Sequence, residues 1–256
     1  VSVCIPARNE ESNIGDCIRA VLSNNHPDFT VWVYDDQSTD STRQIVEGLA
    51  AQDARVRLCP SASLPEGWVG KQFACDQLGR TAEGQWLLFI DADVRLKPDC
   101  IGRTLGFAHD SRAALVSCFP KQVTGSAAER LIVPMIHFIL LSYLPFARMR
   151  STRDPAASAA CGQFIMVDRS AYLATGAHAA IRESMHDGVK LPRLFRRAGL
   201  HTDLFDGTDM ATCRMYSGMR STWRGFAKNA YEGLGSPILL VLLTSLHAFG
   251  HVLPWV

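Results

Sequence analysis

The sequence predicts an α/β fold with a mainly parallel sheet and flanking helices. Short apolar segments alternate with helix-length segments through the first half of the chain, and polar clusters follow three of the apolar segments directly. Strands that alternate with helices imply crossover connections, which join parallel strands. The 256 residues are 47% hydrophobic and 20% charged, which is typical of a globular protein and excludes a disordered or collagen-like chain.

The charge balance and the cysteines narrow the class of protein further. There are 26 basic and 25 acidic residues, so the net charge of +1 argues against a nucleic-acid binder with a broad basic surface. The eight cysteines form no CxxC pair and most lie in apolar segments. We therefore expect buried free thiols in a reducing compartment rather than disulfides.

Five apolar segments are predicted as strands: 1–5, 30–34, 56–58, 85–90 and 114–119. Because the first of them opens the chain, we expect that further residues precede Val1. Asn9-Glu10-Glu11 is typical of a helix N-cap followed by acidic residues, and Ser41-Thr42-Arg43-Gln44 is typical of a capping box. A further helix is predicted over 188–198.

The second half contains two strongly apolar segments. Residues 131–146 are too few to cross a bilayer of about 30 Å, so they predict a core helix or an interfacial helix, with Arg148, Arg150 and Arg153 directly after it. Residues 237–256 carry no formal charge and follow several basic residues, which indicates the cytoplasmic side of a membrane. A C-terminal core helix is the alternative for this segment, and the charge pattern favours membrane association.

Three polar clusters, at 6–10, 35–40 and 91–93, follow predicted parallel strands, and ligands bind at that edge of an open α/β sheet. Asp40 alone is typical of a helix cap. Asp91 and Asp93, two positions apart after a buried strand, can both reach one polyphosphate site. Two carboxylates suit a divalent cation that also binds phosphate oxygens.

On these residues the chain resembles a family 2 glycosyltransferase with the GT-A fold, a Rossmann-like nucleotide-diphospho-sugar transferase. The matching elements lie in the family's order over about residues 1–200 and are 5–10, 35–42, Gly70-Lys71, 89–93 and His186-Asp187.

The resemblance implies roles for individual residues. The first two loops would hold the nucleotide of a UDP-sugar through Pro6, Arg8, Glu10 and Asp36, with Asp36 accepting the imide N–H of uracil. Lys71 would face the nucleotide, Asp91 would contact the ribose or a metal-bound water, and Asp93 would bind Mg²⁺ or Mn²⁺.

Asp187 is the candidate catalytic base. In the family an acid near the start of a helix, usually in Glu-Asp, removes the proton of the acceptor hydroxyl. His186 replaces that Glu here, so the role of the acidic partner stays open. A carboxylate at a helix N-terminus is stabilised as the anion. An N-cap is the alternative role for Asp187; the base is favoured over it, and one residue can serve as both.

Two further features concern the acceptor. The Gln-x-x-Arg-Trp motif of processive members is missing, which favours transfer of a single sugar. Residues 64–71 and 224–229 resemble the hopene- and carotenoid-associated branch, which implies a lipid acceptor at the cytoplasmic face of the cell membrane. The expected organisation is a nucleotide-sugar-binding half at 1–120, an acceptor and base half at 121–235, and a membrane-associated or transmembrane segment at 236–256.

Two other functions are weighed against this one. A sugar-phosphate nucleotidyltransferase is expected to open with a glycine-rich, Arg-containing loop, which residues 6–10 are not. A non-catalytic membrane protein that retains a nucleotide pocket is expected to have lost Asp93 or Asp187, and both are present.

Overall fold

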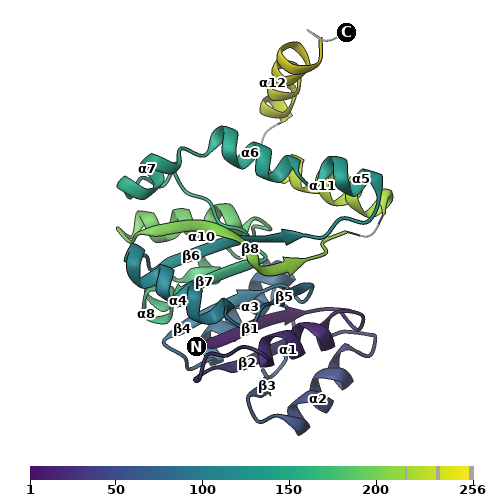
Figure 1. The fold of residues 1–256 in the computed structure, drawn as a ribbon, viewed down its shortest axis with the longest axis vertical. Coiled ribbons are helices and arrows are strands. Elements are labelled where there is room, and N and C mark those ends of the chain that lie inside the picture. Colours follow the sequence, from purple (N-terminus) through teal and green to yellow (C-terminus); the bar gives the residue numbers. More distant parts are fainter. Residues whose placement is uncertain (217, 235–236, 254–256) are drawn as a thin grey trace. The chain divides into compact units, whose positions relative to one another are not determined.

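The computed structural model describes residues 1–216, 218–234 and 237–253 (Figure 1). The chain forms two compact units. The first consists of Val1–Val123 and Phe138–Met215, and the second of Thr124–His137 and Tyr216–Val256.

The first unit contains an eight-stranded sheet, counted over the described residues. The strands lie in the order β3 (Val56–Leu58), β2 (Thr30–Asp35), β1 (Ser2–Ala7), β4 (Trp86–Ile90), β7 (Phe164–Asp168), β6 (Leu115–Gln122), β8 (Thr202–Cys213) and β5 (Val94–Leu96). The first four strands are parallel to one another, and β6 is parallel to β8. β7 is antiparallel to both of its neighbours, and β5 is antiparallel to β8. The α/β prediction is confirmed, with a sheet that is mixed.

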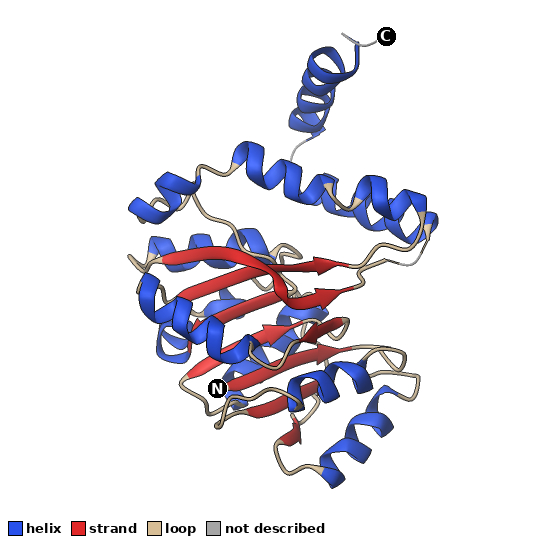
Figure 2. Cartoon of the chain, in the orientation of Figure 1, coloured by secondary structure: helices blue, strands red, loops and turns tan. Residues whose placement is uncertain are grey.

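Helices cover both faces of the sheet (Figure 2). Successive side chains of each strand point to opposite faces, so the buried strands contribute to one apolar core on each face. Val3 and Ile5 belong to one apolar core, whereas Cys4 belongs to the other. The first core includes α1 (Ile14–Leu22), α2 (Thr42–Gln52) and α4 (Cys100–Ser111). The second includes α3 (Gly70–Thr81), α8 (Arg169–Thr175), α9 (Ala177–Ala180) and α10 (Asp187–Arg197).

Two predicted helix starts are wrong in detail. Asn9 has a positive φ of 55° and does not cap α1; the carbonyl of Glu10 accepts the N–H groups of Asn13 and Ile14 instead. At α2 the predicted capping box does not form, because Ser41 makes no side-chain cap bond. Asp40 Oδ1 accepts the Thr42 N–H at 2.9 Å, so Asp40 serves the capping role that its residue type indicates.

The apolar segment 131–146 is divided among three helices, α5 (Ala127–Ile132), α6 (Met135–Tyr143) and α7 (Phe146–Ser151). Pro134 lies at the break between the first two, where its missing N–H and its ring interrupt a helix. The single helix that the apolar run indicates is therefore not formed.

The second unit contains α5, α11 (Met219–Leu234), α12 (Pro237–His247) and a π-helix over Ala248–Val252. The Glu129 carboxylate accepts the N–H groups of Gly125 and Gly218, each at 2.6 Å, and so joins α5 to the segment before α11. Hydrogen bonds from these N–H groups lower the pKa of Glu129 to about 2. Within the described ranges no helix is both long enough and apolar enough to cross a membrane. Of the predicted segment 236–256, residues 236 and 254–256 lie outside the described residues.

All eight cysteines are buried and free of disulfides, as predicted.

Candidate active site

The predicted site residues lie at one edge of the sheet because β1, β2 and β4 are parallel and end there. Ala7 pairs with Asp35 at the ends of β1 and β2. β7 is antiparallel to β4, so it begins at this same edge, with Phe164 opposite Ile90. The loop before β7 consequently reaches the Asp91-Ala92-Asp93 segment, and Asp91 donates its N–H to the Gln163 carbonyl at 3.2 Å.

Lys71 joins two of the predicted residues, Asp91 and Asp187. It lies in the first turn of α3, and its Nζ is 2.7 Å from Asp91 Oδ1 and 3.2 Å from Asp187 Oδ2. The same ammonium donates to the Gly162 carbonyl at 3.0 Å. Pro6 lines the small pocket around these groups. Two carboxylates 96 positions apart in the sequence, Asp91 and Asp187, thus share one cation.

Asp187 is the first residue of α10 and is buried. Its Oδ1 accepts the Gly188 N–H at 2.7 Å. Gly162 packs so closely against this carboxylate that a Cβ there would overlap Oδ1. The Ala160 N–H donates to the Gly188 carbonyl at 2.7 Å, which fixes the start of α10 against the loop before β7.

The pKa values of the two carboxyl groups beside Lys71 are shifted in opposite directions. Burial raises the pKa of Asp91 to about 6 despite the attraction of Lys71, and the charges of Asp93 and Asp187 add to the rise. Burial also acts against the charged form of Asp187. Lys71, His178 and the Gly188 N–H outweigh that effect and hold the pKa of Asp187 below its usual value. Asp187 is therefore an anion at neutral pH.

Arg8 and Asp36, predicted as nucleotide contacts, form a second group. Arg8 Nη1 is 3.3 Å from Asp36 Oδ2, and the Asp36 side chain is only 10% exposed. A Cβ on Gly70 would lie 2.7 Å from Asp36 Oδ2, so a residue with a side chain at position 70 would push the carboxylate away. Since Lys71 follows Gly70 directly, the start of α3 adjoins both groups.

The loops after β1 and β2 are tied together by hydrogen bonds. The Asn9 N–H donates to Ser38 Oγ at 2.9 Å, and Asn9 Oδ1 accepts the Thr39 N–H at 2.8 Å. The Glu10 N–H donates to Thr42 Oγ1 at 2.7 Å. Burial raises the pKa of Glu10, and the neighbouring Asp93 adds to that rise. Glu10 is thus placed close to the predicted metal ligand.

Asp93 offers one oxygen that fits a cation. Its Oδ1 is buried and has no hydrogen-bond partner, although the Cys213 thiol interacts with the same carboxylate group. A buried carboxylate oxygen without a partner is costly. The described part of the chain contains no cluster of three or more His, Cys, Asp or Glu residues able to hold a metal by themselves. A cation at Asp93 would therefore need further oxygen ligands from a bound molecule, such as a diphosphate.

A buried aromatic pair that no sequence pattern indicated lies beneath Asp187. His178 Nδ1 lies 2.7 Å from Tyr172 Oη, and Tyr172 donates to the Cys75 carbonyl at 3.1 Å. His178 lines the same small pocket as Lys71 and Asp187. It follows two residues with positive φ, Gly176 at 74° and Ala177 at 41°. An isolated histidine on a four-residue helix has no spacing that would have identified it; the Thr175-Gly176 helix end was the one available signal.

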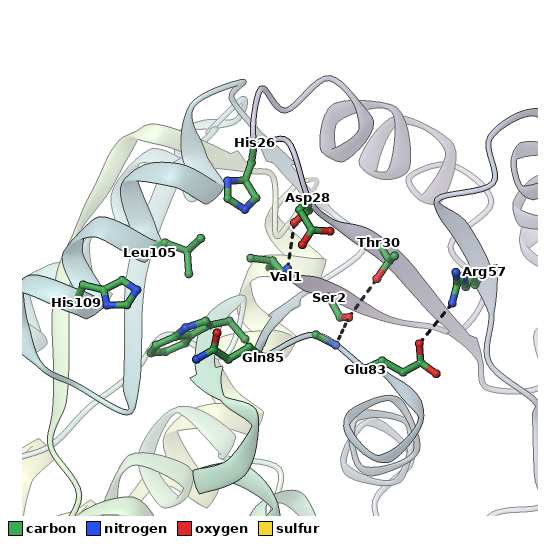
Figure 3. A pocket seen from close by; sticks show the side chains of 12 residues that line it. Val1, Ser2, His26, Asp28, Thr30, Arg57, Glu83, Gln85, Leu105 and His109 are labelled. Atoms are coloured by element: carbon green, nitrogen blue, oxygen red, sulfur yellow. Dashed lines mark hydrogen bonds and ion pairs between the residues drawn. The ribbon is translucent and has the colours of Figure 1, made fainter.

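A different pocket opens at the opposite edge of the sheet, at the amino ends of β1, β2 and β4 (Figure 3). Ser2 Oγ contacts Thr30 Oγ1 at 3.1 Å there and accepts the Gly84 N–H at 3.0 Å. None of the predicted site residues lines this pocket. Because ligands of such sheets bind at the carboxyl edge, the group of Lys71, Asp91 and Asp187 is the candidate functional site.

The mixed α/β sheet with acidic loops at its carboxyl edge is the architecture of GT-A nucleotide-sugar transferases. A mannosyltransferase from Pyrobaculum calidifontis, solved with GDP-Man and Mn²⁺, superposes with a TM-score of 0.70 at 18% identity, covering 91% of this chain and 61% of its own. Staphylococcus aureus TarS superposes with a TM-score of 0.59 at 16% identity, covering 99% of this chain and 44% of its own.

The Glycosyl transferase family 2 model matches residues 2–175, and the chain belongs to this family. It is 26% identical over 248 residues to the 4,4'-diaponeurosporenoate glycosyltransferase of Staphylococcus haemolyticus (strain JCSC1435), covering 95% of this chain and 64% of the relative. The enzyme of the same name from S. aureus (strain USA300) is 26% identical over 244 residues, covering 92% and 62%. The chain thus spans less than two thirds of the length of these relatives. They confirm the resemblance to the carotenoid-associated branch.

Proposed function

We propose that this chain is an inverting, metal-dependent glycosyltransferase that moves one sugar from a nucleotide-sugar to a hydroxyl of a lipid acceptor at the membrane. The observation that carries the proposal is the contact of Lys71 with both Asp91 and Asp187. It brings Asp91, the first acid of the pair that follows β4, next to a helix-terminal carboxylate, an arrangement that suits transfer from a nucleotide-diphosphate donor.

The donor side is assigned to residues 1–120. Asp36, paired with Arg8 and given room by Gly70, is the proposed acceptor for the imide N–H of uracil, and Pro6 and Glu10 complete the nucleotide loops. We therefore favour a UDP-sugar. S. aureus TarS has been solved with UDP, whereas the P. calidifontis mannosyltransferase holds GDP-Man. The similarity of fold therefore does not by itself identify the nucleobase of the donor.

The chemical step is assigned to Asp187, in the half formed by residues 121–235. As an anion at the start of α10, it accepts the proton of the acceptor hydroxyl while the hydroxyl oxygen attacks the anomeric carbon. A single displacement opposite the leaving nucleoside diphosphate inverts the anomeric configuration. Asp93 would hold a divalent cation, Mg²⁺ or Mn²⁺, which supplies positive charge to the leaving diphosphate.

A lipid acceptor is favoured by the apolar side chains that the second unit exposes. Leu131 on α5 and Met219 and Trp223 on α11 are each at least 65% exposed. Among the described side chains of the C-terminal segment, the exposed large apolar ones are Ile238, Val241, Leu242, Leu246, Phe249 and Leu253. We propose that this segment associates with the cytoplasmic face of the cell membrane. Relatives named for action on 4,4'-diaponeurosporenoate support an apolar acceptor.

The arginines after the apolar segment contribute less to this proposal than their sequence indicates. Arg148 is paired with Asp154 at 2.5 Å, and Arg150 with Asp203 at 3.4 Å. Arg153 is exposed and has no acidic partner among the described residues, which leaves it available for a lipid phosphate.

Incubation of the purified protein with a panel of nucleotide-sugars and Mg²⁺ or Mn²⁺ tests the reaction. We expect slow release of free sugar and nucleoside diphosphate, fastest from a UDP-sugar, and faster release with lipid acceptors. Release of pyrophosphate from sugar phosphate and nucleoside triphosphate would instead support the nucleotidyltransferase. Nucleotide binding without turnover on any acceptor would support the non-catalytic alternative.

Fractionation of cells without detergent tests the membrane assignment separately. We expect the protein in the membrane fraction and higher activity on vesicle-borne acceptors. Full recovery in the soluble fraction, with equal activity on a water-soluble acceptor, would contradict the lipid acceptor and leave sugar transfer intact.

A further inference from the structure

The Lys71 ammonium is saturated by acceptors in this structure. It has three N–H bonds and three partners, namely Asp91 Oδ1 at 2.7 Å, Asp187 Oδ2 at 3.2 Å and the Gly162 carbonyl at 3.0 Å. Asp91, the proposed nucleotide contact, and Asp187, the proposed base, therefore share the single cation of Lys71.

Both oxygens of Asp187 are engaged as a result. Oδ1 accepts the Gly188 N–H, and Oδ2 is paired with Lys71. Hydrogen bonds and opposite charge stabilise the anion and hold it less basic. A general base works best when its proton affinity is near that needed at the operating pH, so Asp187 in this arrangement is a poor proton acceptor.

We propose that Lys71 is a positioning residue that links donor binding to activation of the base: a bound nucleoside diphosphate draws its ammonium away from Asp187 Oδ2. This inference rests on the proposed function. Asp187 then becomes more basic only when a donor is present, and the acceptor hydroxyl is deprotonated after the donor has bound.

The charges around Asp187 single out Lys71 for this role. The titratable groups that face Asp187 are Lys71 and Cys75 from α3, Asp91 after β4, Cys161 from the loop before β7, and His178 from α9. Burial raises the pKa values of both thiols, to about 12 for Cys161, and lowers that of His178 to about 4. In this set Lys71 is thus the one cation at neutral pH, and its displacement is the change that most raises the basicity of Asp187.

The exposed fractions of the Lys71, Asp91 and Asp187 side chains agree with a movement of the ammonium from Asp187 to a bound diphosphate. The Lys71 and Asp91 side chains are 34% and 30% exposed, whereas that of Asp187 is 10% exposed. A diphosphate entering at the carboxyl edge can therefore reach the ammonium, while Asp187 stays behind it. In the step that follows, the acceptor O–H bond breaks and its proton goes to Asp187 Oδ2. The oxygen bonds to the anomeric carbon, and the bond from that carbon to the diphosphate breaks, with its electron pair leaving on the diphosphate.

The test measures the pKa of Asp187 directly. Protein labelled with ¹³C at the aspartate carboxyl groups is titrated by NMR, and the Asp187 signal is assigned by its loss in Asp187→Asn. With saturating UDP and Mg²⁺ we expect the pKa of Asp187 to rise by at least one unit, a tenfold change in its protonation equilibrium. In Lys71→Met we expect a raised pKa already without nucleotide, and little further change with it. Arg80→Met removes a cation from the exposed side of the same helix and should leave the Asp187 titration as in the wild type.

The outcomes separate this inference from the proposed function. UDP binding measured by calorimetry, with an unchanged pKa of Asp187, would overturn the role of Lys71 and leave sugar transfer intact. An equal rise in Lys71→Met would do the same, because the diphosphate charge would then act on Asp187 without the lysine. No nucleotide binding at all would overturn both. If Lys71→Met does not fold, Lys71→Gln, which removes the charge and keeps a polar side chain, takes its place in the same comparison.

Discussion

The phenolic oxygen of Tyr172 lies 2.7 Å from Nδ1 of His178, and neither residue is more than 1% exposed. Burial lowers the pKa of His178 to about 4, with Lys71 acting in the same direction and Asp187 against it. His178 is therefore neutral at pH 7. The pair forms a buried support of uncharged aromatic groups beneath Lys71 and the proposed base.

The neutral histidine makes the fold sensitive to acid. A histidine whose pKa is lowered on folding binds fewer protons in the native state, so its contribution is complete above pH 6.5 and is lost as the pH falls toward 4. Between pH 7 and pH 5 this single group should cost about 2 kcal/mol of unfolding free energy. Urea unfolding of His178→Phe at the two pH values should show a loss smaller by that amount than in the wild type. Equal losses in the two proteins would mean that His178 titrates normally.

The absence of a side chain at Gly79 leaves room for the ring of Tyr172. A Cβ at this buried position of α3 would overlap the Tyr172 ring, so Gly79→Ala should destabilise the protein by about 1–3 kcal/mol through overpacking. Gly102 in α4 is the matched control, because a Cβ there meets nothing within 4 Å. Gly102→Ala should stabilise the protein by about 0.5–1 kcal/mol through helix propensity. Thermal unfolding of both variants measures the difference, and a shift of the same sign in both would contradict the packing argument.

Removal of the proton acceptor should separate binding from chemistry. Asp187→Asn keeps the shape of the side chain and deletes its charge, so we expect kcat to fall by about a thousandfold while UDP still binds. NMR of the wild-type product should show an inverted anomeric centre. A retained configuration would refute the single displacement at Asp187.

Asp93→Ala should abolish transfer and remove the metal dependence of nucleotide binding, because it deletes the carboxylate oxygen that no protein group satisfies. Calorimetry of UDP binding with and without Mn²⁺ checks this. Asp110→Ala, an exposed position on α4, is the control and should leave both measurements unchanged. Activity near the wild-type level in Asp93→Ala would show that the metal ligand lies elsewhere.

Asp36→Ala should raise the donor KM more than it lowers kcat. The contact of Asp36 with the uracil of the donor is present in both the ground state and the transition state. Asp16→Ala breaks an exposed ion pair with Arg19 on α1 and should have no effect on the donor KM. Initial rates over a range of donor concentrations distinguish the two. An unchanged donor KM in Asp36→Ala would place the nucleotide at other residues.

The sequence was most informative where a local pattern determines the structure. The five predicted strands are all present, because short apolar segments between polar turns leave few alternatives, and the helix predicted over 188–198 forms one residue earlier as α10. β5, β7 and β8 escaped prediction. Their partners in the sheet are distant in sequence, and β7 runs antiparallel to β4, which no local pattern specifies.

In the candidate site, too, local patterns were predicted, whereas contacts between residues distant in sequence were not. Asp91 and Asp93 were predicted from their position directly after a recognisable strand, and Asp187 from the resemblance to the family's acid at a helix start. The shared ammonium of Lys71, the room made by Gly162 and the pair of Tyr172 with His178 depend on side chains that meet only in the folded chain. Helix starts were wrong where a neighbouring loop competed for the cap, as at Asn9, whose side chain bonds Thr39 instead.

The contacts of Gly162 restrict where this chain can be joined to a segment of a related enzyme to form a chimera. The Gly162 carbonyl accepts a hydrogen bond from Lys71 of the proposed donor half, and its missing side chain makes room for Asp187 of the proposed acceptor half. The carbonyl of the neighbouring Gln163 accepts the N–H of Asp91. A graft that replaced the acceptor half with that of a relative would need a glycine at this position and a loop of the same length. Acceptor preference is therefore better exchanged through segments that begin after β7 than through a cut near residue 120.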